Sequence, residues 1–391
     1  MRTILSALAS VAMLIGVLIN PTLALAQSAT ATTTPIQHVV VIFDENISFD
    51  HYFGTYPKAV NPPGQPRFVA APNTPSVNGL NPGLLTNNPN LNPANGTGAA
   101  NPFRLNRTQA LTADMSHSYG PEQASFDHGL MDLFPLDTGA AGTSSNMSVP
   151  SPPVVTTKGL VMGYYDGNTV TAMWNYAQHY ALSDNSYNTQ FGPSSPGAIN
   201  LISGQTNGIS GSMNPTLSGT TSASSNAVYD GQSGFTLIGD ADPIGDVCSG
   251  PTKFQASLSG NNVGELLNTA GLTWGWFQGG FDLTAVNPNG TTLCNRSTVS
   301  PITGLTEADY VPHHEPFQFY SSTANPNHTR PTSVASIGSA GDAGNHQYDI
   351  HDFFDALAAG NLPAVRKGEG NENQASGVLL LSAARLYDRP R

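Results

Sequence analysis

Five short polar clusters in this sequence hold the side chains that catalysis or metal binding requires. Carboxylates, an amide, serines and histidines recur in them, although the chain has only 10 histidines. The clusters are Asp44-Glu45-Asn46 with Ser48, Asp50 and His51; Asp114 with His117; Ser194-Ser195; His313-His314-Glu315; and His346 with Asp349, His351 and Asp352.

Together these residue types suit metal-assisted transfer of a group from an oxygen ester. The oxygens of Glu45 and Asn46 can hold a hard or borderline divalent cation. A serine at a helix N-terminus lies beside backbone N–H groups that stabilise an anion, and a nearby metal ion makes its hydroxyl a better nucleophile. Histidines can hold the other oxygens of the anion or protonate the leaving group.

Each cluster also has a purely structural interpretation. Residues 44–46 can be a polar turn after a strand, and Ser194 can be only a helix cap. His313 and His314 can be a satisfied surface pair, and His117 an ordinary capping or core histidine. The cluster from His346 to Asp352 lies on or beside a helix with its own apolar face, so structural roles are favoured there.

The regular elements expected around these clusters alternate between strand and helix. A strand over 36–43 ends at Asp44, and LTWGWFQGG is expected to form another strand after a short helix over 262–270. A helix is expected to begin at Ser194, with Ile199 and Leu201 pointing inward. This alternation predicts an α/β fold with a mostly parallel sheet, in which ligands bind at the carboxyl ends of the strands.

Two further helices are expected from their apolar spacing. In residues 165–184 the apolar face is predicted as Met173, Tyr176, Ala177 and Tyr180. In residues 349–360, Asp349 is the expected N-cap, Gly360 ends the helix, and the apolar stripe is predicted as Ile350, Phe353, Phe354 and Leu357.

Three segments rich in Pro, Gly, Asn or Ser interrupt these elements. Residues 61–103, 139–155 and 208–226 show no helical or strand periodicity and are interpreted as surface insertions over one core.

Composition excludes some partners. Net charge is −12 over 391 residues, which argues against nucleic acid binding. An acidic chain that binds a phosphate needs local positive charge, and a metal ion is the obvious source.

Residues 1–26 are predicted to be a signal peptide. Arg2 precedes an apolar stretch, and the A-x-A site at residues 24–26 favours cleavage before Gln27 over retention as a membrane anchor. The mature protein is therefore expected to be exported, in the periplasm or outside the cell, without a stable membrane anchor. In that oxidising setting Cys248 and Cys294 are expected to form one disulfide.

Several of these blocks together resemble a bacterial phosphoesterase family that contains secreted phospholipases C and related acid phosphatases. Its opening pattern, E-N-x-S-F-D-H-Y-F-G, is present from Glu45 to Gly54. TADMSHSYGPEQ, residues 162–206, VPHHEPFQFY and NHQYDIHDFFDALAAGNLPAV are similar to further family blocks in the same order, so that the resemblance covers residues 36–365.

The resemblance implies a fold and a set of site residues. The fold is an alkaline-phosphatase-like α/β sheet flanked by helices. Glu45 and Asn46 are implied to hold a divalent metal ion together with Ser194, which is also the nucleophile that forms a phosphoserine. His117, His313 and His314 are implied to line the phosphate pocket. S-S-P-G-A at residues 194–198 is closer to the acid phosphatase branch than to the T-x-P-N-R of the phospholipases, and Ser195 is the alternative nucleophile.

The resemblance ends near the C-terminus. Members of the family continue with a further active-site histidine and an Asp-Asp pair that completes the metal site. Residues 366–391 contain neither and are rich in Lys and Arg, so we interpret them as an atypical tail, the C-terminal part of the fold as missing, and the phosphoesterase domain over 36–365 as incomplete.

The prediction from sequence is thus an exported metal-dependent phosphoesterase acting on phosphate esters, either soluble ones or phospholipids. Two alternatives stay open at this point: a phospholipase C acting on phosphatidylcholine-like lipids, and an inactive truncated member of the family.

Overall fold

A four-stranded parallel sheet forms the centre of the computed structural model, which describes residues 35–43, 47–110, 112–138, 159–187, 190–209, 226–231, 234–300, 304 and 306–369. The strands lie in the order β1-β12-β8-β11, and all three pairings are parallel. Their bounds are Val39–Phe43 for β1, Val365–Glu369 for β12, Trp274–Gln278 for β8 and Gln347–Asp349 for β11. The predicted α/β class and the predicted strands over 36–43 and 272–280 are confirmed.

The register of the sheet places the ends of its four strands in one row. Phe43 pairs with Glu369, Glu369 with Gln278, and Gln278 with Asp349. The chain therefore leaves every strand at the same edge, which is where ligands bind in parallel α/β sheets. β12 runs across the predicted domain boundary at residue 365.

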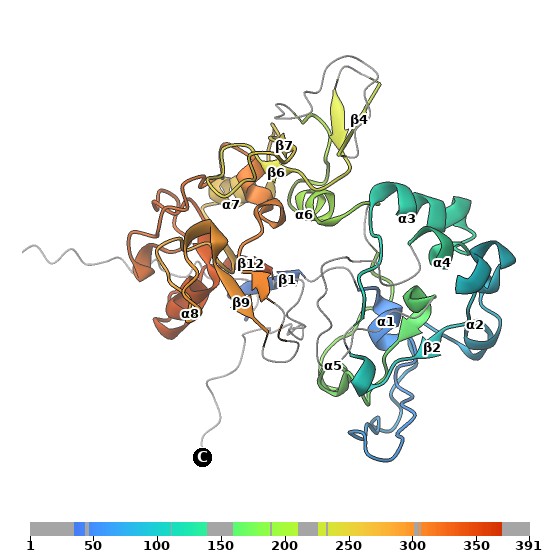
Figure 1. Cartoon of the computed structure of the whole chain (residues 1–391). Helices are drawn as coiled ribbons and strands as arrows, with labels where there is room; N and C mark the ends of the chain where they lie inside the picture. The colour runs from blue at the N-terminus through green and yellow to red at the C-terminus, as the bar shows by residue number, and fades with distance from the viewer. Residues whose placement is uncertain are drawn as a thin grey trace, which may run out of the picture.

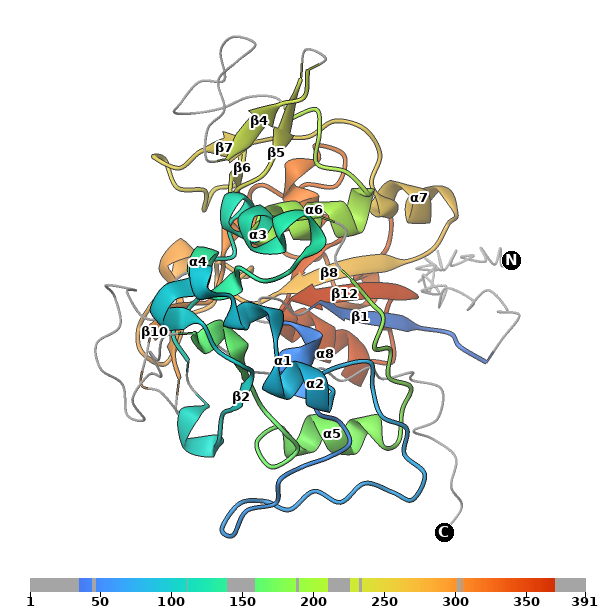
Figure 2. The ribbon, with the colours of Figure 1, turned by 90° about the vertical axis from the view of Figure 1, so that its right-hand side faces the viewer.

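Helices cover the two faces of this sheet. Trp274 and Trp276 of β8 pack in one apolar cluster with helix α6 (Ser194–Ser203) and helix α7 (Val263–Thr269). Phe277 packs in a second cluster with helix α8 (Ile350–Ala358). Because side chains alternate along a strand, neighbouring residues of β8 serve opposite layers. Figure 2 shows α6 and α8 on opposite sides of β8 and β12.

Local capping explains where α7 and α8 begin. Asn262 and Asp349 are their N-caps, and each takes part in a capping box with the residue three positions later. Gly360, just beyond α8, has a φ of +68°, which glycine adopts without strain. The predicted starts of both helices and the predicted end of α8 are confirmed.

The predicted buried faces of the helices are partly wrong. In α6, Ile199 is buried as expected, but Ile202 is buried in place of Leu201, which is 46% exposed. In α8, Ile350, Phe354 and Leu357 of the predicted stripe are exposed, whereas Ala356 is buried against the sheet. Apolar spacing shows that a helix has a buried face, but the neighbouring elements decide which face is covered.

Helix α5 (Thr171–Ala177) shows the same kind of error. Tyr176 and Tyr180 of its predicted apolar face are 40% and 50% exposed. The buried residue is Trp174, which packs on Phe68 and donates a hydrogen bond from Nε1 to the carbonyl of Tyr52 at 2.7 Å. The segment before residue 70, which covers this helix, determines its orientation.

A lobe of short elements lies beside the sheet (Figure 1). Its core contains Tyr56, Phe68 and Trp174 in one cluster and Leu105, Leu160 and Tyr165 in another. Its elements are α1 (Phe49–Phe53), α2 (Pro82–Thr86), η1 (Pro89–Leu91), η2 (Pro93–Gly98), β2 (Phe103–Arg104), η3 (Arg107–Gln109), α3 (Tyr119–Phe126), η4 (Asp127–Gly129), α4 (Phe134–Asp137), η5 (Leu160–Met162), β3 (Gly163–Tyr164) and α5.

The interpretation of residues 61–103 as an irregular surface insertion is wrong in part. The segment contains α2, η1 and η2, each with an asparagine N-cap and a proline in its first turn. Asn90 and Asn95 are buried and donate to the carbonyls of Met131 and Asp132. The two segments are thus joined by buried asparagine side chains and not by apolar ones. Hydrophobic periodicity therefore does not predict the short helices of residues 61–103. The predicted insertion at 139–155, and most of the one at 208–226, lie outside the described residues.

The remaining short elements lie between α6 and β11 in the sequence. They are β4 (Ala227–Tyr229), β5 (Phe235–Leu237), β6 (Asp242–Pro243), β7 (Gln255–Ala256), η6 (Leu293–Asn295), β9 (Ser297–Val299), β10 (Thr306–Ala308), η7 (Pro312–His314), η8 (Pro316–Phe319) and η9 (Val334–Ser336). A disulfide joins Cys248 to Cys294, as predicted. Within the described residues, no helix has the length and apolar character that crossing a membrane requires.

Substitution of Gly264 tests the packing of α7 on β8. A Cβ at this position would overlap the Trp274 ring. Gly264→Ala should therefore lower the free energy of unfolding by about 1–3 kcal/mol, the usual cost of overpacking. Gly120→Ala is the matched control, because Gly120 also lies in the first turn of a helix but has no atom within 4 Å of the added Cβ. Urea denaturation that finds Gly264→Ala as stable as this control would contradict the packing described.

Candidate functional site

Ser194 is the first residue of α6, as predicted. Gly192, with a φ of +125°, and Pro193 turn the chain into the helix. The helix dipole makes this end of a helix attractive to an anion. Ser194 and Ser195 are both almost fully buried, at 2% and 0% exposure.

The two serines differ in their hydrogen bonds. The N–H and the hydroxyl of Ser195 both donate to Asp240 Oδ1 at 3.0 Å, and the hydroxyl also lies 3.1 Å from the carbonyl oxygen of His313. Within the described residues, the Ser194 hydroxyl has no hydrogen-bond partner. Ser195 therefore fastens the start of α6 to its surroundings, while the Ser194 hydroxyl is available for chemistry.

His313 lies against two aspartates. Its Nδ1 is 3.4 Å from Asp242 Oδ1, and its Nε2 is 4.0 Å from Asp240 Oδ2. Burial would raise the pKa of Asp242, but the nearby His313 and a hydrogen bond from the Gly250 N–H lower that pKa below its ordinary value. Asp242 therefore stays ionised at neutral pH.

His314 and Glu315 complete this segment. They are 3% and 0% exposed, and the His314 ring packs edge-on to His313 with the centroids 4.6 Å apart. The alternative of a satisfied surface pair therefore does not fit His314, which is buried.

His117 approaches the same helix start through Glu122 of α3. Glu122 Oε2 accepts a hydrogen bond from the Gly192 N–H at 2.7 Å. Burial raises the pKa of Glu122, while this hydrogen bond and the charge of His117 act to lower it. The His117 ring is held by the Met115 carbonyl oxygen, 2.9 Å from its Nδ1, and by Asp114 at 3.7 Å. His117 and His313 thus approach the neighbours of Ser194 from distant parts of the chain. His117 lies near Glu122, which binds Gly192, and the His313 carbonyl contacts Ser195.

The segment that carries His313 lies over the carboxyl edge of the sheet. The side chain of Gln278, the last residue of β8, donates to the carbonyl of Val311 at 3.0 Å. Glu45 and Asn46 lie outside the described residues, so their distances to Ser194 are untested. The residues on either side of them are described: β1 ends at Phe43 in the same row as Gln278, and α1 begins at Phe49.

The sequence analysis missed Asp240 and Asp242. Both lie in the run IGDADPIGD, whose three aspartates within seven residues were a signal in a chain with few charges. Their contacts with Ser195 and His313 join residues 45 or more positions apart, which spacing along the chain does not show.

Other histidines of the predicted clusters have structural roles. His51 Nδ1 lies 2.6 Å from the Gly163 carbonyl oxygen, and burial lowers the pKa of His51. His346 stacks on Trp274 with its Nδ1 2.8 Å from the Trp274 carbonyl oxygen, and burial lowers its pKa as well. For His346 this agrees with the structural role that the sequence favoured.

Two groups of residues in the described part of the chain have ligand atoms within 4.8 Å of one another, as a metal site requires. In the first, Asp246, Cys248 and His328, the sulfur belongs to the disulfide. The carboxylate of Asp246 already accepts hydrogen bonds from Tyr310, Gln318 and the Cys248 N–H, and it contacts His328. This group is therefore a satisfied buried network and does not fit a metal ion.

The second group, His351, Asp352 and Asp355, already has a cation. Arg330 donates two hydrogen bonds to the carboxylate of Asp352, at 2.6 and 2.5 Å. The His351 ring contacts both Asp352 and Asp349. A guanidinium that occupies the carboxylate in bidentate fashion leaves no position for a metal ion.

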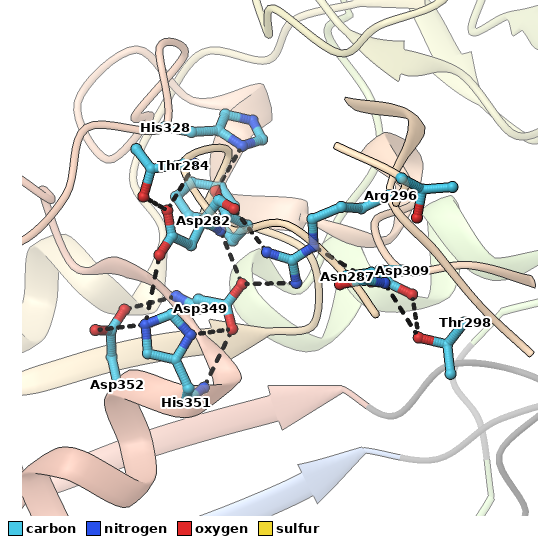
Figure 3. Close-up of polar contacts among 12 residues, drawn as sticks. Asp282, Thr284, Asn287, Arg296, Thr298, Asp309, His328, Asp349, His351 and Asp352 are labelled. Carbon is cyan, nitrogen blue, oxygen red and sulfur yellow. Dashed lines mark hydrogen bonds and ion pairs between the residues drawn. The ribbon is translucent and has the colours of Figure 1, made fainter. Parts of the chain in front are cut away.

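This group continues into a network of charges at the end of β11 (Figure 3). Arg296 contacts Asp349 at 3.6 Å and Asp309 at 3.3 Å, and it donates to the carbonyl of Asp282. The carboxylate of Asp349 also accepts the N–H of Asp282 and the N–H of His351. Arg296, Asp309 and Asp349 are each at most 10% exposed, and their contacts hold the loop after β8 against the start of α8.

Comparison with known families identifies the chain. The sequence model of the Phosphoesterase family matches residues 36–368, which is most of the chain. The chain belongs to the phosphoesterase family. This confirms the family-level prediction and supports a hydrolase that acts on phosphoric esters. A search of curated proteins finds no match.

The His351–Asp349 contact should make stability depend on pH. Hydrogen bonding to Asp349 raises the pKa of His351 above its ordinary value of 6.5, against the opposing effect of burial. The contribution is therefore fully present below pH 6.5 and is lost as the pH rises through the higher pKa of the folded protein. His351→Asn should be less stable than the native chain at acidic pH, by an amount that shrinks above neutrality.

Urea denaturation between about pH 5.5 and 8.5, the range around the histidine pKa, measures this difference. His179→Asn, which removes an exposed histidine from the end of α5, is the control. A stability difference for His351→Asn that grows with pH would contradict the assignment.

Proposed function

We propose that this chain is an exported, metal-dependent phosphoesterase that hydrolyses phosphate esters through a phosphoserine formed on Ser194. The observation that carries the proposal is the start of α6, where Ser194 has a buried hydroxyl without a partner among the described residues. Its neighbours Gly192 and Ser195 contact the segments of His117 and His313. Membership of the phosphoesterase family supports the reaction class.

The local contacts favour Ser194 over Ser195 as the nucleophile. The Ser195 hydroxyl is engaged with Asp240 and the His313 carbonyl, and its attack on phosphorus would break both contacts. Ser194 precedes it at the start of α6, where its own backbone N–H and the helix dipole can stabilise an oxygen of a phosphoryl group.

A divalent metal ion would be held by Glu45, Asn46 and Ser194. All three offer oxygen ligands, and the buried hydroxyl of Ser194, which has no partner among the described residues, fits this use. When bound, the ion lowers the pKa of the serine hydroxyl and neutralises charge that develops on the phosphoryl group.

The side chains of this protein then do three things. The first turn of α6 binds and orients the phosphoryl group, His117 and His314 line its pocket, and a histidine protonates the leaving alcohol. Burial of the serine excludes bulk water until the phosphoserine has formed. Water then hydrolyses that intermediate and regenerates Ser194.

The finer assignment within the family also belongs to this proposal. We place the chain nearer to the acid phosphatases because of S-S-P-G-A at residues 194–198, and we assign it an alkaline-phosphatase-like fold, which the parallel sheet and the helices on both its faces support. Export follows from the predicted signal peptide over 1–26.

Replacing the two serines separately tests the nucleophile. Ser194→Ala should lower kcat for p-nitrophenyl phosphate by roughly 10³-fold or more, as removal of a nucleophile does, with the fold intact. Ser195→Ala should cost about tenfold or less, because it removes only the hydroxyl contacts to Asp240 and the His313 carbonyl that hold the start of α6. Steady-state rates, with a dispersed phospholipid assayed in parallel, give the comparison. Equal turnover by the native chain and Ser194→Ala would remove the proposed function, and the reverse order of the two losses would move the nucleophile to Ser195.

Removal of the metal ion tests the role of Glu45. Chelation should abolish activity, and addition of a divalent cation should restore it. Glu45→Gln should weaken metal binding, measured by calorimetric titration, by at least the roughly 10–100-fold that loss of an outer hydrogen-bond partner causes. Asp230→Asn, an exposed carboxylate in the β4–β5 hairpin, is the control. Unchanged metal affinity in Glu45→Gln would exclude Glu45 as a ligand.

A further inference from the structure

Asp242 is held in a fixed position by the backbone around it. Its Oδ2 accepts the N–H of Gly250 at 2.8 Å, and its own N–H donates to the carbonyl of Phe254 at 2.9 Å. The side chain is 3% exposed and lies in β6, which pairs with β7. A carboxylate anchored at one oxygen and buried presents its other oxygen in a single direction.

That second oxygen faces His313. Asp242 Oδ1 and His313 Nδ1 are both buried, neither makes a hydrogen bond of normal geometry in the described structure, and they lie 3.4 Å from each other. The two atoms are therefore each other's partner, at a distance that a small rotation of the imidazole ring shortens to a hydrogen bond. A carboxylate in contact with Nδ1 selects the tautomer that has its proton there.

The opposite nitrogen of His313 points toward the start of α6. Nε2 lies 4.0 Å from Asp240 Oδ2, and the other oxygen of Asp240 binds the N–H and hydroxyl of Ser195. The His313 backbone is fastened to the same place, because its carbonyl oxygen lies 3.1 Å from the Ser195 hydroxyl. The ring therefore has a buried, anchored side at Asp242, and its other nitrogen lies on the side of Asp240, which binds the residue after Ser194.

We infer that His313 is the acid that protonates the leaving alcohol, and that Asp242 is the positioning residue that directs its Nε2 at that oxygen. The inference rests on the proposed function and assigns one of its steps to a particular pair of side chains. His117 suits the role less well, because the carboxylate beside it, Asp114, is 64% exposed, whereas Asp242 beside His313 is 3% exposed.

His313 gives its proton to the leaving alcohol as the phosphoserine forms, and it regains a proton when water hydrolyses the intermediate. The ionised Ser194 oxygen, whose proton has passed to solvent, forms a bond to phosphorus as the bond from phosphorus to the alcohol oxygen breaks. The electron pair of the broken bond stays on the alcohol oxygen, which takes the proton from His313 Nε2. Nδ1 keeps its proton against Asp242. In the second step a water molecule attacks phosphorus, gives one proton back to Nε2 and releases the Ser194 oxygen.

The dependence of rate on the leaving group tests this assignment. p-Nitrophenolate leaves without help from an acid, whereas an alkoxide does not. Asp242→Asn and His313→Gln should therefore each lower kcat for ethyl phosphate by about 10²-fold or more, the usual contribution of a general acid, and for p-nitrophenyl phosphate by less than tenfold. KM should change little, and the double variant should be no worse than His313→Gln, because the two residues act as one unit.

A second buried carboxylate supplies the control. Asp349→Asn removes a carboxylate of similar burial from the network at the end of β11 and should lower stability without changing the ratio of the two rates. An equal loss on both substrates in Asp242→Asn would overturn the inference and leave the proposed function standing. Failure of the native chain to exceed Ser194→Ala would remove both.

Nuclear magnetic resonance of the imidazole nitrogens gives a readout that needs no turnover. The His313 signals, identified by their loss in His313→Gln, should show a proton fixed at Nδ1 in the native chain and a mixture of tautomers in Asp242→Asn. A native ring with its proton at Nε2 alone would overturn the positioning role of Asp242, whatever the activity.

Discussion

The parallel hydrogen-bond register of the sheet is the constraint on which the site depends. Because Phe43, Glu369, Gln278 and Asp349 share one row, the segments after β1 and β8 emerge at the same edge. A parallel strand can be followed only by a connection that leaves this edge, so polar residues from distant parts of the chain gather there. A shift of register by one residue would turn every strand side chain to the opposite face and dismantle both layers of helices.

Above that edge, the start of α6 is fastened from two sides. Asp240 binds the backbone and side chain of Ser195, and Glu122 binds the N–H of Gly192. Both acceptors are carboxylates, which the positive end of a helix stabilises. The turn that presents Ser194 is therefore held in place, while the Ser194 hydroxyl makes no hydrogen bond to the part of the chain that the structure describes, as a preorganised nucleophile requires.

Buried charge elsewhere in the molecule is paired and has a structural role. The Arg330–Asp352 pair and the Asp246–His328 pair resemble metal sites in composition, but each carboxylate already has a cationic or hydrogen-bonding partner. Geometry of ligand atoms alone is thus insufficient evidence for a metal ion, and the hydrogen bonds that each ligand already makes decide the matter.

Local sequence signals determined the elements that depend on neighbours in the chain. The start of α8 follows from Asp349 as N-cap, the start of α7 from Asn262, and β8 from its run of large apolar residues. The order and spacing of the family blocks also determined membership of the phosphoesterase family, and the type and position of Ser194 as the first residue of a helix.

Only the tertiary structure decided which faces of the helices are buried and which carboxylates meet His313. Leu201 and Ile202 are equally apolar, and the packing of α6 on β8 alone selects Ile202. Asp242 is 71 residues from His313 along the chain, and no local signal marks the two as partners. The free energy of such contacts arises from burial between segments that the fold brings together, so it cannot be read from the spacing of residues.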